Sequence, residues 1–204
     1  QSDRAAIAFF WPFIFLIIFG SAGKSISHTS TMPLQSILIL GALLDALTFR
    51  VAVLLARNVY EEVGSKSLPN LFSSPFTLTD WILSLALYAA GMFSVLCVFL
   101  SILSFMLFGF NVFIFGKFLL ILLPNIYCTA LAFGFLGSCF IVRSGVRTLV
   151  YAFMMISTIT PLSGFFYDIQ VMPKIAQHVS FFFPSSHIAL QCKQLMIKGV
   201  FSRY

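Results

Sequence analysis

The tripeptide Gly23-Lys24-Ser25 is a group of residues in this 204-residue chain whose types suggest nucleotide chemistry. It resembles the end of a P-loop, in which backbone N–H groups and a lysine hold the phosphates of a nucleotide. That motif also needs a glycine five residues before Gly23, and Ile18 stands there. A P-loop follows a strand, whereas this tripeptide follows an apolar segment of membrane-spanning length. We therefore expect no nucleotide site in this chain.

Histidine and cysteine, which serve as metal ligands and nucleophiles, do not occur at the spacings that these roles need. No histidines form an H-x-x-x-H pattern and no cysteines form a C-x-x-C pattern. The cysteines all lie in apolar surroundings, which favours a role as small apolar fillers. We predict no catalytic residue, no metal and no cofactor in this chain; the residues concerned are His28, His178, His187, Cys97, Cys128, Cys139 and Cys192.

Asp45 and Arg50 are ionisable residues within one apolar stretch. An ionised group at the centre of a bilayer costs about 2.5–3.5 kcal/mol on insertion scales, so such residues usually face a bundle interior or a cavity. Asp45 could belong to a substrate path or connect two helices. Alternatively, Asp45 pairs with a neighbour while Arg50 extends to the membrane surface, and the residues alone favour this structural role. A five-residue separation does not place both on one helix face, so we expect no direct pair.

The composition indicates which elements must position these residues. Hydrophobic residues make up 60% of the chain and charged residues 9%, whereas a soluble domain carries about 25% charged residues. So few charges cannot cover a water-soluble fold, and we predict a membrane protein. The net charge of +6 comes from basic residues that stand singly between apolar segments. This pattern indicates loops near lipid headgroups and not nucleic-acid binding.

The hydropathy pattern predicts an all-α fold, a polytopic transmembrane helical bundle that forms a single domain over residues 1–204. A helix needs about 20 apolar residues to cross a hydrocarbon core about 30 Å thick. Five segments meet this length: residues 5–23, 34–56, 81–108, 112–142 and 148–166.

Residues 175–199 are also apolar, but Pro184 interrupts them. A proline inside a helix ends or kinks it, and each half is too short to cross a bilayer. Lys193 and Lys198 would lie at membrane depth if the stretch crossed straight through, at a cost of several kcal/mol. We predict a re-entrant helix pair, in which backbone at membrane depth is shielded by protein or a water-filled cavity.

Residues 57–80 form the long polar segment and are predicted to be a loop. Thr79 or Asp80 can cap the following span. The segment is either an ordinary interfacial helix lying on headgroups or a docking element for a soluble motor. Basic residues are nearly balanced between the two sides of the membrane and do not decide the orientation. We place this loop in the cytoplasm because of the resemblance described next, so Ser163, Tyr167 and His187 are expected near the outer face.

Two groups of residues resemble the signatures of the membrane subunits of type-2 ATP-binding-cassette exporters, and their order and spacing fit nearly the whole chain. The first runs from the end of one span to the start of the next: Ala56-Arg57, Glu61-Glu62, Leu71-Phe72-Ser73-Ser74-Pro75 and Trp81. The second is similar to the family's Pro-Leu-Ser-Gly-x-Phe-Tyr signature, its Leu-Pro turn and its Pro-x-x-His: Thr160-Pro161-Leu162-Ser163-Gly164-Phe165-Phe166-Tyr167, Met172-Pro173 and Phe183-Pro184-Ser185-Ser186-His187. Met172 departs from the leucine that the family often has.

The resemblance implies a permease subunit with six spans, a dimeric pore built with a second copy or a similar permease, and two cytosolic ATPase subunits that hold ATP and magnesium. We expect both ends of the protein to be missing here, with the sixth span following Tyr204. The residues implied for contact with the ATPase are Arg57, Glu61, Glu62, Lys66, Leu68, Leu71 and Phe72. The candidates for the translocation path or its gate are Asp45, from its position within the second span, and, from the second group of motifs, Pro161, Ser163, Tyr167, Pro184 and His187.

The implied function is export by a multi-pass protein of a plasma membrane, in particular a bacterial inner membrane, with a path lined by the second and fifth spans. The chief alternative is a secondary transporter or channel that needs no ATPase. Such proteins usually show internal repeats and several buried charges, whereas only Asp45 lies mid-span here and no repeat is visible. A passive structural protein of a larger membrane assembly is a third alternative.

Overall fold

The structure is a computed structural model that describes residues 2–27, 34–67, 73, 75 and 77–197, and these residues contain helices and no strand. This confirms the predicted all-α bundle. The α-helices are α1 (Ser2–Ser27), α2 (Leu34–Gly64), α4 (Leu78–Phe108), α5 (Leu119–Ser144), α6 (Leu149–Ser157), α7 (Ile159–Leu162), α8 (Lys174–Phe181) and α9 (Pro184–Ile197). Short 3₁₀ helices are η1 (Val112–Phe118), η2 (Val146–Thr148) and η3 (Ile169–Val171).

Within the described residues, four helical segments are long and apolar enough to cross a membrane: Phe9–Ile26, Leu34–Gly64, Leu78–Phe108 and Phe115–Ser144. The protein is therefore membrane-embedded. The two helices of 31 residues, α2 and α4, are each about 46 Å long at 1.5 Å per residue. Because this length exceeds the hydrocarbon thickness of about 30 Å, their ends extend beyond the core of the bilayer.

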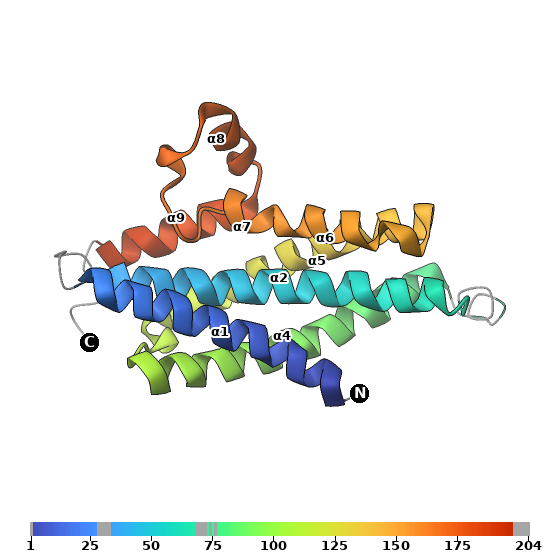
Figure 1. Ribbon diagram of the computed structural model, residues 1–204, viewed down its shortest axis with the longest axis horizontal. Coiled ribbons are helices and arrows are strands. Elements are labelled where there is room, and N and C mark those ends of the chain that lie inside the picture. The colour runs from blue at the N-terminus through green and yellow to red at the C-terminus, as the bar shows by residue number, and fades with distance from the viewer. Residues whose placement is uncertain (1, 28–33, 68–72, 74, 76, 198–204) are drawn as a thin grey trace.

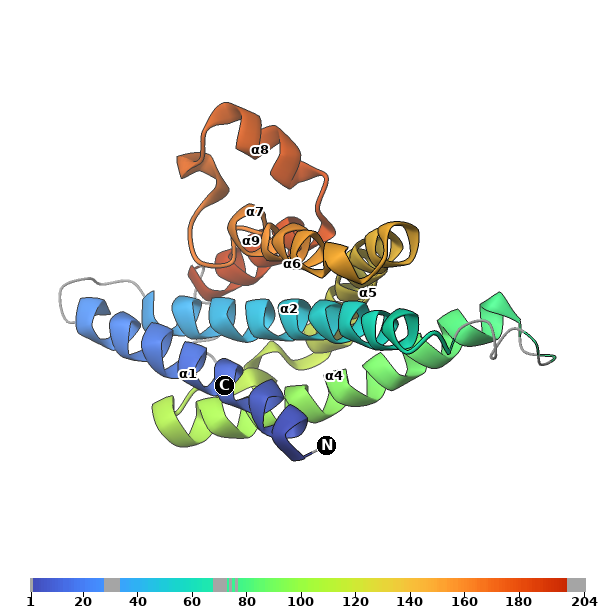
Figure 2. The same ribbon diagram turned by 45° about the vertical axis from the view of Figure 1, so that its right-hand side comes forward.

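Helix α2 forms the centre of the bundle, with α1 and α4 on one side of it and α5, α6 and α9 on the other (Figures 1 and 2). Of its most apolar window, 72% is buried inside the protein, compared with 22% for α4. Many exposed residues of α4 are large and apolar, for example Met106 at 76% exposure, which suits a lipid-facing surface. A polar residue in the most apolar part of α2, such as Asp45, thus lies inside protein, whereas much of α4 faces lipid.

Helix α4 begins at Leu78, three residues before the predicted span, because a capping box fixes its first turn. The side chain of Thr77 accepts from the backbone N–H of Asp80, and the Asp80 carboxylate accepts from the backbone N–H of Thr77. Such reciprocal bonds satisfy N–H groups that have no partner inside the helix. The helix ends at Gly109, whose φ of 67° is the left-handed conformation that glycine adopts without strain.

The predicted loop over residues 57–80 begins too early, because α2 continues as a helix to Gly64. Arg57 and Glu61 are one turn apart on this helix, and their side chains pair at 3.2 Å. Charged residues at i and i+4 support a helix beyond its apolar part, which explains why the polar composition did not end α2.

The predicted fifth span over residues 148–166 is also too long. Its helical part is α6 followed by α7, which together reach from Leu149 to Leu162. Fourteen residues rise about 21 Å, which is less than the hydrocarbon thickness. Helix α6 ends where the hydroxyl of Thr158 donates to the carbonyl oxygen of Met155, and Gly164 turns the chain with φ +64°. The fourth predicted span likewise begins as η1, and its α-helix starts only at Leu119.

The stretch over residues 175–199 is divided as the proline predicts, into α8 of 8 residues and α9 of 14 residues, with Pro184 as the first residue of α9. Their lengths of about 12 and 21 Å are both below the hydrocarbon thickness. Helix α8 stands away from the bundle in both views (Figures 1 and 2). Whether the pair enters and leaves from one membrane face remains a prediction.

Candidate functional site

A hydrogen bond between α2 and α7 is the centre of the candidate site. The hydroxyl of Thr160 donates to a carboxylate oxygen of Asp45 at 2.7 Å, and Asp45 is only 5% exposed. Its helix is the most buried of the four long helices, so the carboxylate lies inside the bundle and not against lipid. Interhelical hydrogen bonds in membrane proteins contribute up to about 1.7 kcal/mol, so this contact helps to tie the broken helix α6–α7 to the centre of the protein.

A cavity of about 410 Å³ adjoins this hydrogen bond. It lies between α1, α2 and the α6–α7 pair. Its lining combines aromatic surface with a small number of polar groups, as is common in binding sites. The lining residues are Trp11, Pro12, Phe15, Asp45, Ala46, Phe49, Arg50, Ser157 and Thr160.

Arg50 lines the same cavity as Asp45, but no ion pair between the two side chains occurs among the described residues. This agrees with their five-residue spacing on a helix. The cavity therefore carries a carboxylate held by Thr160 and a half-buried guanidinium that bonds to no described residue. An occupant with both a positive and a negative group would fit this pair.

The turn after α7 packs closely on α2. A Cβ atom on Gly41 would lie 2.6 Å from the carbonyl oxygen of Phe165, so the small residue permits this approach of two backbones. Ser163 is buried and donates to the carbonyl oxygen of Thr160 at 3.0 Å. The hydroxyl of Tyr167 donates to the carbonyl oxygen of Pro161. The structure thus brings Pro161, Ser163 and Tyr167 together beside Asp45 and Thr160.

Lys193 on α9 holds the same turn from the other side. Its ammonium group donates to the carbonyl oxygens of Gly164 at 2.6 Å and Tyr167 at 2.8 Å. These bonds satisfy carbonyl groups of the turn that follows α7, which have no helical partners because the helix ends at Leu162. The 163–167 turn is therefore clamped between α2 and α9.

Pro184 and His187 lie at the junction of α8 and α9 and not beside Asp45. The Nε2 atom of His187 is 2.9 Å from the carbonyl oxygen of Phe181, and Ser186 donates to the carbonyl oxygens of Ser180 and Phe183. These bonds fix the angle between the two helices. The predicted gate residues therefore fall into two groups, one at the Asp45 cavity and one at this junction.

The predicted coupling residues that the structure describes lie near the end of α2 and in the turn after it. Glu62 accepts a hydrogen bond of 2.6 Å from the indole nitrogen of Trp81, which joins α2 to the start of α4. Lys66 is exposed in a turn with φ 55°. Leu68, Leu71 and Phe72 lie outside the described residues.

Three contacts at these places were not predicted from the sequence: Thr160 with Asp45, Lys193 with the 163–167 turn, and Trp81 with Glu62. Asp45 and Thr160 are 115 residues apart in the sequence, and Gly164 and Lys193 are 29 residues apart. No local spacing signals such a pair. The Thr160 contact was partly foreseeable, since a buried carboxylate needs a hydrogen-bond donor.

No group of three or more histidine, cysteine, aspartate or glutamate side chains in the described part of the chain could hold a metal ion. Comparison with protein-family models, with curated proteins and with solved structures found no match. The functional assignment therefore depends on the residues and on the geometry of the site.

Proposed function

We propose that this chain is the membrane-spanning subunit of an ATP-driven exporter of the type-2 ATP-binding-cassette kind. It forms the translocation path, while separate cytosolic subunits hydrolyse ATP. The observation that carries this proposal is the buried Asp45, bonded to Thr160 beside a cavity of about 410 Å³. The resemblance of two motifs to that family supports it.

The position of the cavity suits a path that opens and closes. One wall is α2, and the opposite wall is the interrupted helix α6–α7. A short, interrupted helix can shift relative to its neighbour more easily than a continuous span that packs along its full length. Breaking and remaking the Thr160–Asp45 bond would then distinguish two states of the path.

A motor can shift such a path only if it contacts the two states differently. Helix α2 is the element that connects the two places, because Asp45 and the predicted coupling residues Arg57, Glu61 and Glu62 all lie on it. Movement of the cytosolic end of α2, where Glu61 and Glu62 lie, would be transmitted to Asp45 through a rigid helix.

Helix α8 supports the presence of a second permease subunit. It stands away from the bundle (Figure 1), and among the described elements it packs mainly on α7, α9 and η3. Several apolar side chains on and beside it are exposed, including Val171 at 81%, Ile175 at 81% and Phe182 at 87%. A second copy of this chain or a similar permease would cover them. The proposed location is the bacterial inner membrane, with the residue 65–77 connection in the cytoplasm.

The test is co-purification of an ATP-hydrolysing subunit from native membranes. The double variant Glu61→Lys and Glu62→Lys should lose the ATPase activity that copurifies with the wild-type protein. Trp81→Phe is the matched control, because it removes the hydrogen bond to Glu62 without reversing a charge. Retention of the ATPase activity by the charge-reversal variant would contradict the proposed contact. Loss of that activity in both variants would show that the substitutions disturb the fold of this region and not a direct contact.

A secondary transporter without an ATPase is the second candidate, and the buried carboxylate of Asp45 favours it, since such groups mark ion and proton paths. Reconstituted vesicles separate the two. Uptake that depends on an imposed proton or sodium gradient, and that persists without any ATPase, would support the second candidate. Strict dependence on ATP and on the partner would support the first.

A further inference from the structure

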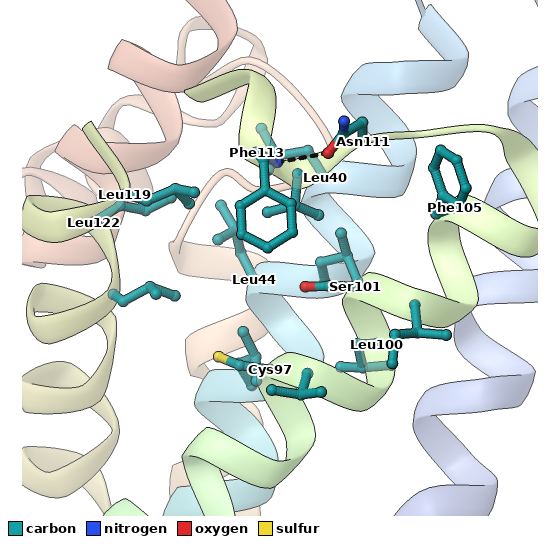
Figure 3. A pocket seen from close by; sticks show the side chains of 16 residues that line it. Leu40, Leu44, Cys97, Leu100, Ser101, Phe105, Asn111, Phe113, Leu119 and Leu122 are labelled. Carbon is teal, nitrogen blue, oxygen red and sulfur yellow. Dashed lines mark hydrogen bonds between the residues drawn. The ribbon is translucent and has the colours of Figure 1, made fainter. Parts of the chain in front are cut away.

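Helices α4 and α5 form a wedge that opens toward one end of the bundle. They are connected near one end, where the hydroxyl of Tyr127 donates to the carbonyl oxygen of Ala86 at 2.5 Å and the rings of Phe93 and Tyr127 lie 5.4 Å apart. Toward the other end, from Cys97 on α4 and Leu123 on α5, a cavity of about 500 Å³ lies between them (Figure 3). It is separate from the cavity at Asp45.

The floor and the mouth of this cavity differ in exposure. The floor is made of buried leucines, four of them at helical spacing on one face of α2: Leu40, Leu43, Leu44, Leu47 and, from α5, Leu122. The mouth is made of exposed apolar side chains on α4 and η1: Val98, Ile102, Phe105 and Phe113. Because Val98, Ile102 and Phe105 belong to the membrane-spanning helix α4, the medium at the mouth is lipid.

The few polar groups of the lining lie at defined depths. Ser101 points into the cavity between Leu44 and Phe113 (Figure 3). Asn111 lies just beyond the end of α4, where its side-chain oxygen accepts from the backbone N–H of Phe113 at 2.9 Å. Its side-chain nitrogen donates to no described residue. An apolar cavity of this kind does not hold ordered water, which needs two to four polar partners.

The length of the cavity matches one leaflet of a bilayer. From Cys97 to the end of α4 at Phe108, the helix rises about 16 Å, and half of a hydrocarbon core about 30 Å thick is about 15 Å. The cavity volume lies within the range of roughly 300–1,000 Å³ typical of small-molecule sites. A single extended hydrocarbon chain has the length and the chemistry that this wedge requires.

We propose that the wedge between α4 and α5 binds one acyl chain of a phospholipid from the surrounding bilayer. The chain lies on the α2 leucines, Phe113 covers it, and the free amide N–H group of Asn111 faces the ester and headgroup region. The inference does not depend on the proposed export function, because it concerns the lipid that surrounds the protein and not its cargo.

The test is photo-crosslinking in vesicles. The protein is reconstituted into phosphatidylcholine and phosphatidylglycerol, with a fraction of phosphatidylcholine that carries a diazirine in one acyl chain. After illumination, mass spectrometry of the digested protein locates the labelled residues. Labelling of the buried floor residues Leu44 and Leu122 is expected, in addition to labelling of outward residues such as Leu120, which is 77% exposed. Labels confined to outward residues would overturn the proposal.

Two variants test whether the labelled floor residues report an occupied cavity. Ser101→Phe places a ring in the cavity and should lower floor labelling several-fold, while Leu120 labelling stays unchanged. Met106→Phe is the matched control on the same helix, since Met106 is 76% exposed and does not line the cavity. If Ser101→Phe fails to fold, Leu119→Phe at the α5 side of the cavity replaces it. Floor labelling that neither variant lowers would overturn the proposal.

The bound species is then identified by native mass spectrometry of the detergent-extracted protein. One retained phospholipid, which is lost in Ser101→Phe and kept in Met106→Phe, is the expected result. Retention of an amphiphile other than phospholipid at this position would overturn the assignment to bilayer lipid. None of these measurements involves transport or ATP hydrolysis, so their failure is distinguishable from failure of the proposed function.

Discussion

Replacing Thr160 with valine removes the hydroxyl that donates to Asp45 at 2.7 Å and keeps the shape of the side chain nearly unchanged. Asp45 is 5% exposed, so water cannot replace the lost donor without entering the bundle. In soluble proteins, a hydrogen bond to a charged group contributes about 1.5–3 kcal/mol. Interhelical bonds in membrane proteins contribute less, about 0.6 kcal/mol on average and up to about 1.7. We therefore expect a coupling free energy between the two side chains of about 1–2 kcal/mol.

A double-mutant cycle measures this coupling. The free energies of unfolding of wild type, Thr160→Val, Asp45→Ala and the double variant are determined by denaturant titration in detergent micelles. The coupling is the difference between the double variant and the sum of the single variants. A coupling of about 1–2 kcal/mol corresponds to a factor of about 5–30 in the unfolding equilibrium constant. The second substitution should therefore change this constant by a factor about 5–30 times smaller in the background of the first substitution than in the wild type.

The matched control is Thr129→Val on α5. The Thr129 hydroxyl is also buried, but it donates to the carbonyl oxygen of Asn125 within its own helix. It should therefore show no coupling to Asp45→Ala. Additivity of Thr160→Val and Asp45→Ala within about 0.5 kcal/mol, the usual scatter for independent sites, would refute the interhelical bond as the link between α2 and α7.

Two further substitutions test the packing around this site. Gly41→Ala should destabilise the protein by about 1–3 kcal/mol, because the new Cβ would lie 2.6 Å from the Phe165 carbonyl oxygen. The control is Gly91→Ala, whose Cβ meets nothing within 4 Å and which should leave the denaturation midpoint unchanged or higher. Equal effects of the two variants would contradict the close approach. Lys193→Met should speed amide hydrogen exchange in the 163–167 turn, because two carbonyl oxygens there lose their donor. Lys193→Arg should restore much of the protection. Unchanged exchange in Lys193→Met would show that the turn does not need this contact.

The central position of α2 explains why these predictions concentrate on one helix. Asp45, Arg50, Arg57 and Glu62 lie on it in sequence, from the inside of the bundle to its far end. A polar residue on α4 at the same depth would face lipid, since that helix is largely exposed. The burial of α2 thus permits ionisable side chains at a depth where they would otherwise carry the full cost of transfer into hydrocarbon.

The fold class and the positions of the long helices were predictable from the sequence by itself. Long apolar segments with 9% charged residues have few options, because only helices or closed barrels satisfy the backbone inside lipid. The break at Pro184 was predictable for an equally local reason, the missing N–H group of proline. Asp45 was recognisable as a buried carboxylate because its neighbours along the chain are apolar.

The ends of the helices were less predictable, because apolar length and helix length are different quantities. Helix α2 continues past the apolar segment to Gly64, where Arg57 and Glu61 pair across one turn. The fifth segment is apolar to Phe166, but its helix ends at Leu162. A membrane requires apolar surface, whereas a helix end is decided by hydrogen bonds of the terminal turns.

The partners of the buried polar groups were decided only by the tertiary structure. Thr160 reaches Asp45 across 115 residues, and Lys193 reaches the 163–167 turn from another helix. The apolar wedge between α4 and α5 likewise depends on the angle at which the two helices pack. The hydropathy of each helix does not indicate this angle. Sequence therefore determined which residues must be buried in this protein, and packing decided what each of them touches, because helix contacts depend on the relative placement of segments that are distant along the chain.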